Sequence, residues 1–432
     1  MLLGAGRGAG LHEEHDMPSL RSLTIATISL ASCHAALGQF TGTTAPPGTT
    51  FPSAVKVARQ APIVASSVGP VVAVWDPAGG VVLVAAPTSG FASAMPEALA
   101  ADGASLIGLM NTTGGATAPF FWTPLGGTID LTGFLAPASA QLRLTDVSAP
   151  AVGAGTVIGD LIAPTTTGLQ RQAFTLPLGG LPVPIGDLPG GLDSSTAIAV
   201  DASGRFAACN GNSLLGAEAF VHDATTGVRT PVGALSAGPT FLSEARDISS
   251  DGNVVVGFSL NAAGVPIAFR WTAATGIVSL GTLPGGFISL ATATNADGSI
   301  IVGVGDDATG VARAWIWTSR CGQMRDLQTE IITVYGQANA AGWLLDVADG
   351  MSDTGFVGGS GLDPLGVRQV WTSQIARCWA DFNGDGMLTP ADATAFNTAF
   401  MAGSMRADCD CDGVLTVLDI TCFNAQFSAG CP

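Results

Sequence analysis

A pattern with a period near fifty residues repeats through most of this 432-residue chain. One position of the pattern, called the ruler position below, measures the repeat length, because its neighbouring copies lie 46 to 54 residues apart. A unit of this size cannot bury its apolar faces alone, so successive units must stack on one another. Seven copies predict seven units between about Phe51 and Ala376. The ruler position is occupied by Trp75, Trp122, Leu176, His222, Trp271, Trp317 and Trp371.

Each unit carries four short apolar runs that are separated by turn-forming residues. In the clearest unit, Glu244 to Gly286, the turns contain Asp-Gly and similar pairs, which supply the positive φ angles of hairpin turns. Four antiparallel strands per period describe a propeller blade. We predict an all-β repeat body, a β-propeller of six or seven blades, with its tryptophans packed between blades. A β-solenoid is the alternative. The four runs are Ala245–Ile248, Val254–Phe258, Ile267–Trp271 and Ile277–Leu280.

Two copies of an acidic loop lie near the C-terminus, DFNGDGMLTPAD from Asp381 and DCDCDGVLTVLD from Asp408. Oxygen-bearing side chains stand at positions 1, 3 and 5, glycine at 6 and aspartate at 12, a spacing that suits calcium. We predict two calcium ions. An acidic turn without an ion is the alternative. The predicted side-chain ligands are Asp381, Asn383, Asp385, Asp392, Asp408, Asp410, Asp412 and Asp419. Met387 and Val414 supply backbone carbonyls, and Thr389 and Thr416 act directly or through water.

A helix is predicted after each loop. Phe396 and Phe400 are four residues apart, as are Phe423 and Phe427, which places each pair on one helix face. The second pair follows the first at the same offset that separates the two loops. Loop and helix therefore repeat together.

The segment from Cys378 to Cys431 resembles a dockerin module of the cysteine-bearing kind that ends some exported bacterial proteins. The resemblance implies a small α-helical module that folds with calcium and docks on a cohesin-like domain of a scaffold. It places the partner-binding residues at loop positions 10 and 11. These are Pro390, Ala391, Val417 and Leu418. A structural cap held by calcium is the alternative, because almost no linker separates Trp371 from Cys378.

The repeats resemble the HAF-type repeats of exported bacterial proteins, most clearly from Ser243 to Thr318. The sequence Ala-Phe-Arg-Trp-Thr that begins at Ala268 carries this resemblance. It implies β structure and an extracellular location, and no established chemistry.

The N-terminal region has the pattern of a signal peptide that starts at Met17. Arg21 precedes an apolar stretch, and a small-residue cleavage site ends at Gly38. A lipoprotein site at Cys33 is the alternative and would anchor the chain to a lipid. We expect an extracellular or cell-surface protein. The predicted segments are a leader over 1–38, a Thr/Pro/Gly tether over 39–52, the propeller over 53–376 and the dockerin-like module over 377–432.

Cysteine usage agrees with export, because small exported modules gain stability from disulfides. Seven cysteines remain after cleavage at Gly38, so one thiol is free or pairs between chains. The connectivity stays open. Five of the eight cysteines lie in the C-terminal segment: Cys378, Cys409, Cys411, Cys422 and Cys431.

The sequence offers little catalytic chemistry. A net charge of −17 argues against nucleic-acid binding, which needs basic patches. His222 is the only histidine that cleavage leaves. We predict a non-catalytic binding or structural propeller that is anchored or assembled through its calcium module, with a cell-envelope partner or a glycan at the propeller face. The alternative is an accessory component or glycoside hydrolase of extracellular polysaccharide catabolism. Its paired carboxylates would come from Glu218, Glu244 and Asp247.

Overall fold

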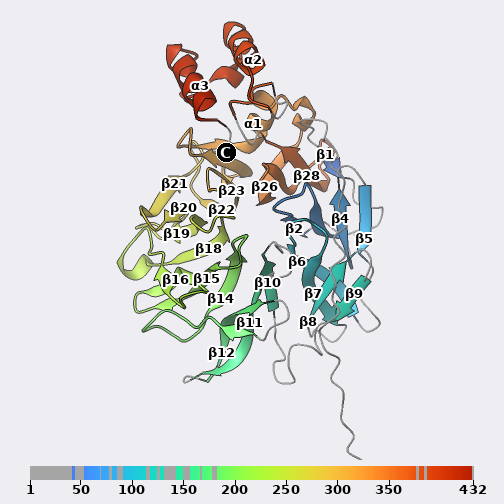
Figure 1. The fold of residues 1–432 in the computed structure, drawn as a ribbon, viewed down its shortest axis with the longest axis vertical. Coiled ribbons are helices and arrows are strands. Elements are labelled where there is room, and N and C mark those ends of the chain that lie inside the picture. The colour runs from blue at the N-terminus through green and yellow to red at the C-terminus, as the bar shows by residue number, and fades with distance from the viewer. Residues whose placement is uncertain are drawn as a thin grey trace, which may run out of the picture. The chain divides into compact units, whose positions relative to one another are not determined.

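A seven-bladed β-propeller makes up the body of the chain. Within the described residues, seven four-stranded antiparallel sheets follow one another around a ring (Figure 1). The predicted propeller is confirmed with seven blades, and the solenoid alternative is wrong. The computed structural model describes residues 41–43, 53–68, 70–76, 80–84, 91–112, 117–123, 127–130, 143–148, 156–165, 168–177, 182–375, 379–383 and 387–430.

The strands are numbered along the chain, and each blade takes them in order from the innermost outward. Blade 1 holds β2 (Ser53–Val57), β3 (Val64–Val68), β4 (Val71–Asp76) and β5 (Gly80–Val84). Blade 2 holds β6 (Phe91–Leu99), β7 (Leu106–Thr112), β8 (Thr117–Thr123) and β9 (Gly127–Asp130). Blade 3 holds β10 (Arg143–Val147), β11 (Thr156–Thr165), β12 (Gly168–Pro177) and β13 (Val183–Pro184). Blade 4 holds β14 (Thr196–Val200), β15 (Phe206–Ser213), β16 (Gly216–Asp223) and β17 (Arg229–Pro231).

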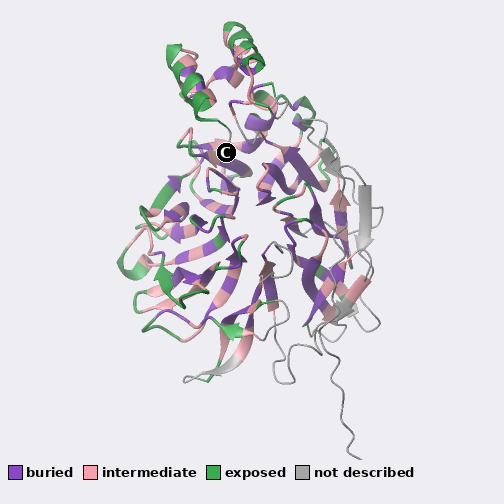
Figure 2. Cartoon of the chain, in the orientation of Figure 1, coloured by how far each residue is buried: buried purple, intermediate pink, exposed green. Residues whose placement is uncertain are grey.

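The remaining blades follow the same plan. Blade 5 holds β18 (Ser243–Ile248), β19 (Val255–Leu260), β20 (Pro266–Thr272) and β21 (Gly276–Gly281), which match the four predicted runs. Blade 6 holds β22 (Ser289–Thr294), β23 (Ile300–Asp306), β24 (Ala312–Thr318) and β25 (Met324–Asp326). Blade 7 holds β26 (Leu344–Met351), β27 (Phe356–Leu362) and β28 (Arg368–Gln374). Buried residues follow the strands of all the blades (Figure 2).

The fourth strand of blade 7 comes from the other end of the chain. Strand β1 (Thr41–Thr43) pairs antiparallel with β28, so that Thr41 faces Thr372. The sequence had placed these residues in a tether, and this part of the prediction is wrong. The pairing of β1 with β28 closes the ring with backbone hydrogen bonds, and it protects the edge of the last sheet.

The ruler position lies on the third strand of every blade, but its last copy is out of register. In blade 5, Trp271 faces Val255 of the second strand. In blade 7, Trp371 faces Gly359. The glycine of blade 5 that corresponds to Gly359 faces Phe269, two residues before the ruler. Trp371 is therefore the counterpart of Phe269.

This second position is the true aromatic anchor of the repeat. In blades 2 to 7 it faces a small residue of the second strand, and every copy is at most 1% exposed. A Cβ on Gly303 would lie 2.6 Å from the ring of Trp315, so the glycine makes room for the ring. At the ruler position Trp122 and Trp271 are buried as predicted, whereas Trp75 and Trp317 are only half-buried. The anchors are Phe120, Phe174, Phe220, Phe269, Trp315 and Trp371.

Cys209 occupies the place of the small residue in blade 4, where it faces Phe220. It is fully buried and is the free cysteine among the described residues. Burial raises the pKa of its thiol far above the ordinary value, and only the thiolate is a good nucleophile. We expect iodoacetamide to leave Cys209 unmodified in the native protein and to modify it fully after denaturation. Peptide mass spectrometry measures both states, and full native labelling would contradict the prediction.

The innermost strands of blades 2 to 7 each contain a β-bulge at the same place. A bulge leaves one residue unpaired and turns its side chain away from the regular alternation. Polar side chains occupy most of these places, which is why an apolar pattern does not run through the inner strands. The bulged residues are Glu97, Thr145, Ile198, Arg246, Thr292 and Asp349.

Burial raises the pKa of the Asp349 carboxyl to about 6. Lys56 and Arg368 lower this pKa, and Asp346 raises it further. Because the folded pKa exceeds the unfolded pKa near 3.9, stability is lost as the pH rises from about 4 to about 6. We expect Asp349→Asn to raise the free energy of unfolding by about 1–2 kcal/mol at pH 7 and to leave it unchanged at pH 3.5. Denaturant titrations at both pH values test this. A pH-independent difference would contradict it.

Among the described residues, helices lie in two inter-blade connections and in the C-terminal module. Helix α1 (Leu327–Thr333) and the short η2 (Ala338–Ala340) join blade 6 to blade 7, and η1 (Gly238–Thr240) joins blade 4 to blade 5. The module contains α2 (Pro390–Met401), η3 (Met405–Ala407) and α3 (Val417–Ala429), which confirms the two predicted helices. Among the described residues, no helix is long and apolar enough to cross a membrane.

Candidate metal centre and binding surfaces

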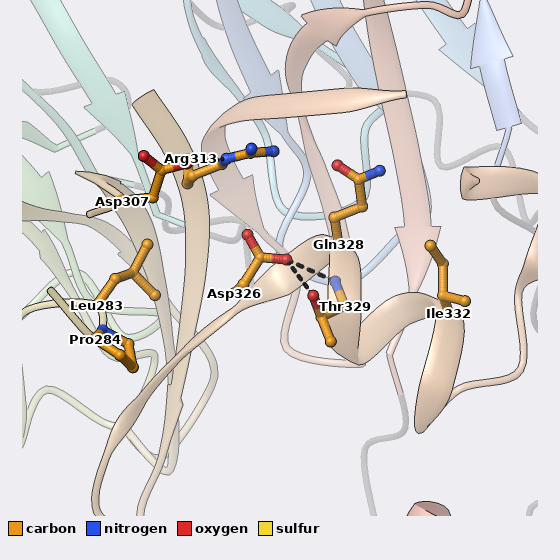
Figure 3. A pocket seen from close by; sticks show the side chains of 8 residues that line it. All are labelled: Leu283, Pro284, Asp307, Arg313, Asp326, Gln328, Thr329 and Ile332. Atoms are coloured by element: carbon orange, nitrogen blue, oxygen red, sulfur yellow. Dashed lines mark hydrogen bonds and ion pairs between the residues drawn. The ribbon is translucent and has the colours of Figure 1, made fainter. Parts of the chain in front are cut away.

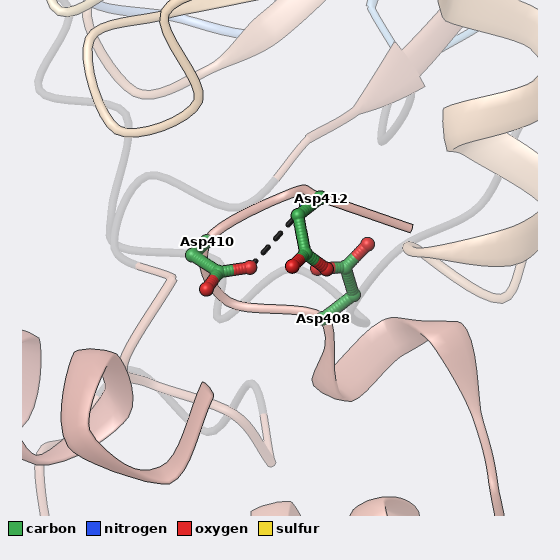
Figure 4. Close-up of side chains that lie close together, drawn as sticks. All are labelled: Asp408, Asp410 and Asp412. Atoms are coloured by element: carbon green, nitrogen blue, oxygen red, sulfur yellow. Dashed lines mark hydrogen bonds between the residues drawn. The ribbon is translucent and has the colours of Figure 1, made fainter. Parts of the chain in front are cut away.

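The second acidic loop gathers three carboxylates. Ligand atoms of Asp408, Asp410 and Asp412 lie within 4.8 Å of one another (Figure 4). The backbone N–H of Gly413 donates to one Asp408 oxygen, Oδ2, over 3.0 Å. The other oxygen, Oδ1, is buried and has no hydrogen-bond partner in the described part of the chain. Such an atom is costly unless something binds it, and a hard cation among three carboxylates would do so.

Electrostatics at this loop also favours a cation. Burial raises the pKa of the Asp408 carboxyl, backbone hydrogen bonds lower it in part, and the charges of Asp419 and Asp410 raise it further. A cation would offset the effects of burial and of these charges, because it neutralises crowded carboxylates that have left bulk water. The residues present therefore fit calcium, which prefers carboxylate and carbonyl oxygens.

The aspartate at position 12 joins the two ends of the second loop. Asp419 is fully buried, and its Oδ1 accepts from the backbone N–H of Cys409 over 2.7 Å. Its Oδ2 accepts from the N–H of Thr416 over 2.7 Å. The Thr416 hydroxyl in turn accepts from the N–H of Leu418 and caps α3. Oδ1 also accepts from the backbone N–H of Asp410 over 3.3 Å, so Oδ2 is the oxygen that keeps a second lone pair for a metal.

The first loop is closed in the same way. Asp392 is fully buried and accepts from the N–H groups of Asn383 over 3.0 Å and Thr389 over 2.8 Å. Thr389 caps α2 as Thr416 caps α3. The predicted ligands Asp381 and Met387 lie on either side of residues 384–386. The predicted ligand Asp385 lies outside the described residues.

Aromatic residues from both halves form the core of the module. The rings of Phe396 and Phe423 stack with centroids 4.2 Å apart. Trp379 contacts both edge-on, at 6.0 Å each. Phe400 and Phe427 are half-buried beside the inner pair, so the predicted helix faces are confirmed. This core is small, which makes the loops an important part of the module's stability.

The four predicted partner residues are all exposed at the first turns of the two helices. Val417 is 70% exposed and Leu418 is 58% exposed at the start of α3. Pro390 and Ala391 hold the same positions at the start of α2. All four side chains are therefore accessible to a partner.

A pocket of about 360 Å³ lies beside α1 (Figure 3). Arg313 forms an ion pair with Asp307 at 2.9 Å on one side. On the other side, Asp326 accepts from the backbone N–H and the hydroxyl of Thr329. A second pocket of about 300 Å³ shares part of this wall. The polar groups suit a hydrophilic ligand. No sequence motif marks the pocket, because its walls come from separate connections. Its lining is Leu283, Pro284, Asp307, Arg313, Asp326, Gln328, Thr329 and Ile332.

The three carboxylates considered for glycoside hydrolysis have structural partners. Asp247 binds Arg59 at 2.6 Å. Glu218 accepts from the backbone N–H of Gly233 over 3.0 Å, and Glu244 pairs with Arg246 at 3.2 Å. Each of the three carboxylates thus has a partner within the propeller.

Arg59 makes an ion pair across the ring that sequence reasoning missed. It belongs to the turn between β2 and β3 of blade 1, whereas Asp247 lies on β18 of blade 5. Its guanidinium also donates to the backbone oxygen of Ile248 over 2.8 Å. Burial opposes its charge, but Asp247, Asp146 and Asp353 hold its pKa above the ordinary value. A lone arginine in a turn carries no motif, so nothing in the sequence marks it.

Comparisons with known proteins support the fold. No family model matches the chain, and no curated protein matches it. A puromycin hydrolase mutant is 15% identical, with a TM-score of 0.51 over 75% of this chain and 52% of that one. A prolyl endopeptidase is 8% identical, with a TM-score of 0.51 over 75% and 48%. The chain thus spans about half the length of these two enzymes. The β-propeller domain of a trilobed protease from Pyrococcus furiosus is 9% identical, with a TM-score of 0.46 over 74% and 94%.

Proposed function

We propose that this chain is an exported, non-catalytic binding or structural β-propeller whose C-terminal module binds two calcium ions. The propeller fold supports a binding or structural role. The observation that carries the calcium proposal is the unpartnered buried oxygen of Asp408 beside Asp410 and Asp412. In this proposal Asp408, Asp410, Asp412, Asp419 and the Val414 carbonyl hold one ion. The first loop holds the other through its equivalent residues.

Calcium would supply positive charge that the loop lacks. The chain's own residues orient the carboxylates. Gly413 and Thr416 donate backbone N–H groups that orient Asp408 and Asp419. The aromatic core includes Phe382 and Cys409, one residue of each loop. Each helix begins directly after its loop, so an ordered loop also orders the exposed apolar pair at the helix start.

Calcium titration of the full chain tests the proposal. We expect two ions per chain by isothermal titration calorimetry, and one ion after Asp408→Asn. Asp297→Asn, in an exposed propeller turn, is the matched control and should still bind two. Absence of calcium binding at millimolar concentration would overturn the proposal.

We further propose that Pro390, Ala391, Val417 and Leu418 bind a cohesin-like or other cell-envelope partner. Their exposure at equivalent positions supports this. The full chain, immobilised in calcium, should capture a specific protein from the producing organism's envelope fraction and release it with chelator. Val417→Asp with Leu418→Asp should abolish capture and keep calcium bound. Equal capture by this variant would remove these residues from the interface.

The pocket beside α1 supports a glycan ligand at the propeller face as part of the same proposal. Its ion pair and hydroxyl can exchange hydrogen bonds with sugar hydroxyls. A glycan array tests this, with Arg313→Ala as the variant that should lose any bound glycan.

A further inference from the structure

The second calcium loop is held from outside by the propeller. Two side chains from the turn between β24 and β25 of blade 6, and one from β25 itself, contact its backbone or its sulfur. Arg320 donates to the carbonyl oxygens of Asp408 and Cys409. Gln323 donates to the carbonyl oxygen of Cys411 over 2.6 Å, and Arg325 donates to Cys411 Sγ over 3.3 Å.

Two disulfides fix the same loop. Cys321 of blade 6 is bonded to Cys411, and Cys409 is bonded to Cys422 of α3. Both loop cysteines alternate with Asp408, Asp410 and Asp412, so the sulfurs and the carboxylates belong to neighbouring residues of one short segment. The carboxylates are thus attached to a backbone that is bonded on one side to the propeller and on the other to α3.

The disulfide to Cys321 also joins a residue with an unfavourable backbone conformation. Cys411 has φ of +62° and is the residue other than glycine with a positive φ in the described part of the chain. L-residues rarely adopt this region, because the side chain approaches the backbone. The equivalent residue of the first loop is Gly384, which has no such restriction. The second loop has therefore exchanged a permissive glycine for a cysteine that is bonded to the propeller.

We propose that the propeller supplies positioning residues for the second calcium site, chiefly Cys321 through its disulfide with Cys411, assisted by Gln323 and Arg320. They keep the loop in its binding conformation before the ion arrives, so that binding costs less conformational entropy. The inference rests on the proposed calcium function and goes beyond it, because it makes the affinity of one site depend on the oxidation state of a propeller cysteine. A dithiol would break the Sγ–Sγ bond. Two electrons and two protons pass to the sulfurs, and the dithiol leaves as its own disulfide.

The test isolates the second site in the full chain by adding Asp381→Asn to every protein. Calcium affinity is then measured by calorimetry in three backgrounds: the oxidised parent, Cys321→Ser with Cys411→Ser, and Cys321→Ser with Cys411→Gly. We expect the serine pair to weaken binding at least about tenfold, which is 1.4 kcal/mol. We expect glycine to recover part of this loss, because it removes the backbone restriction and leaves the disulfide to the propeller broken.

Two further proteins separate positioning from folding. Gln323→Ala keeps the disulfide and should weaken binding by a smaller factor. Cys409→Ser with Cys422→Ser keeps the link to the propeller and serves as the disulfide-matched control. If the serine variant at 321 and 411 does not fold, the variant that lacks Cys409 and Cys422 is treated with a dithiol, so that Cys409–Cys422 is no longer there to be reduced. Its affinity should then fall by the same factor. If the parent binds calcium and both the serine and the glycine variants bind it with the parent's affinity, the positioning role is overturned. Absence of binding by the parent overturns the proposed function itself.

Discussion

Replacing Arg59 with methionine is expected to lower the free energy of unfolding of the propeller by about 3–5 kcal/mol. The side chains of Arg59 and Asp247 are only 15% and 13% exposed, and their ion pair joins blade 1 to blade 5 across the ring. Methionine fills similar space but leaves Asp247 buried without its cation. Removal of one partner from a buried pair costs much more than the pair itself contributes, because the remaining charge cannot be solvated.

The neighbouring contacts should add to this loss. The backbone N–H of Asp353, on blade 7, donates to the carbonyl oxygen of Arg59 over 2.6 Å, and the Asp353 carboxylate accepts from Ser250 of blade 5 over 2.7 Å. Arg59 therefore belongs to a network that includes blades 1, 5 and 7. A change at one residue should lower the stability of the whole ring, because this network links blade 5 to blades 1 and 7, which are not its neighbours in the ring.

Denaturant unfolding of the full chain measures the effect, with two matched variants. Arg59→Lys keeps the charge near Asp247 but loses the contact of the second guanidinium nitrogen with Ser250, so it should lose some stability, and less than methionine. Arg205→Met breaks an exposed ion pair with Asp223 and should change stability little. A methionine variant at position 59 that unfolds within about 1 kcal/mol of the parent would show that the cross-ring pair contributes little.

Local signals explain why the blades could be predicted. Each hairpin is encoded within a few residues, such as Asp251-Gly252, where the glycine has φ of +74°. The helices of the module are equally local, since Thr389 and Asp392 form a capping box. Its sequence signature, a threonine followed three residues later by an acid, recurs in the second loop.

The aromatic anchor shows where periodicity is insufficient. Phe269 and Trp271 are two residues apart on one strand, so both side chains lie on the same face of the sheet. Only the pairing with the neighbouring strand identifies which ring lies over a glycine. Blade 7 has a tryptophan at only one of these two positions, Trp371. The period places it at the ruler position, whereas its pairing shows that it is the anchor.

Long-range pairings account for the other differences. Strand β1 reads Thr-Gly-Thr and has no apolar alternation, and its partner β28 lies near the far end of the propeller sequence. The disulfide between Cys321 and Cys411 spans 90 residues, and eight cysteines allow many pairings. Such contacts depend on the assembled ring, which local patterns do not describe.

Removal of calcium from the full chain is expected to open the C-terminal module and to leave the propeller folded. Without the ion, Asp408, Asp410 and Asp412 repel one another at close range, and the core around Phe396 and Phe423 is too small to offset this. A ligand at a hundred times its dissociation constant stabilises the bound fold by about 2.7 kcal/mol. Backbone amides in α2 and α3 should therefore exchange hydrogen about 100-fold faster after chelation.

Hydrogen exchange followed by mass spectrometry distinguishes the two parts, because peptides from β18 to β20 report on the propeller in the same sample. The disulfide at Cys411 should keep the opened module attached. Replacement of Asp408, Asp410 and Asp412 together by asparagine provides the control. It removes both the ion at that loop and the repulsion, so α3 should no longer respond to chelator. If calcium binds the parent but α2 and α3 exchange equally fast with and without it, the ions do not stabilise the module. The module's order would then come from its disulfides and aromatic core alone.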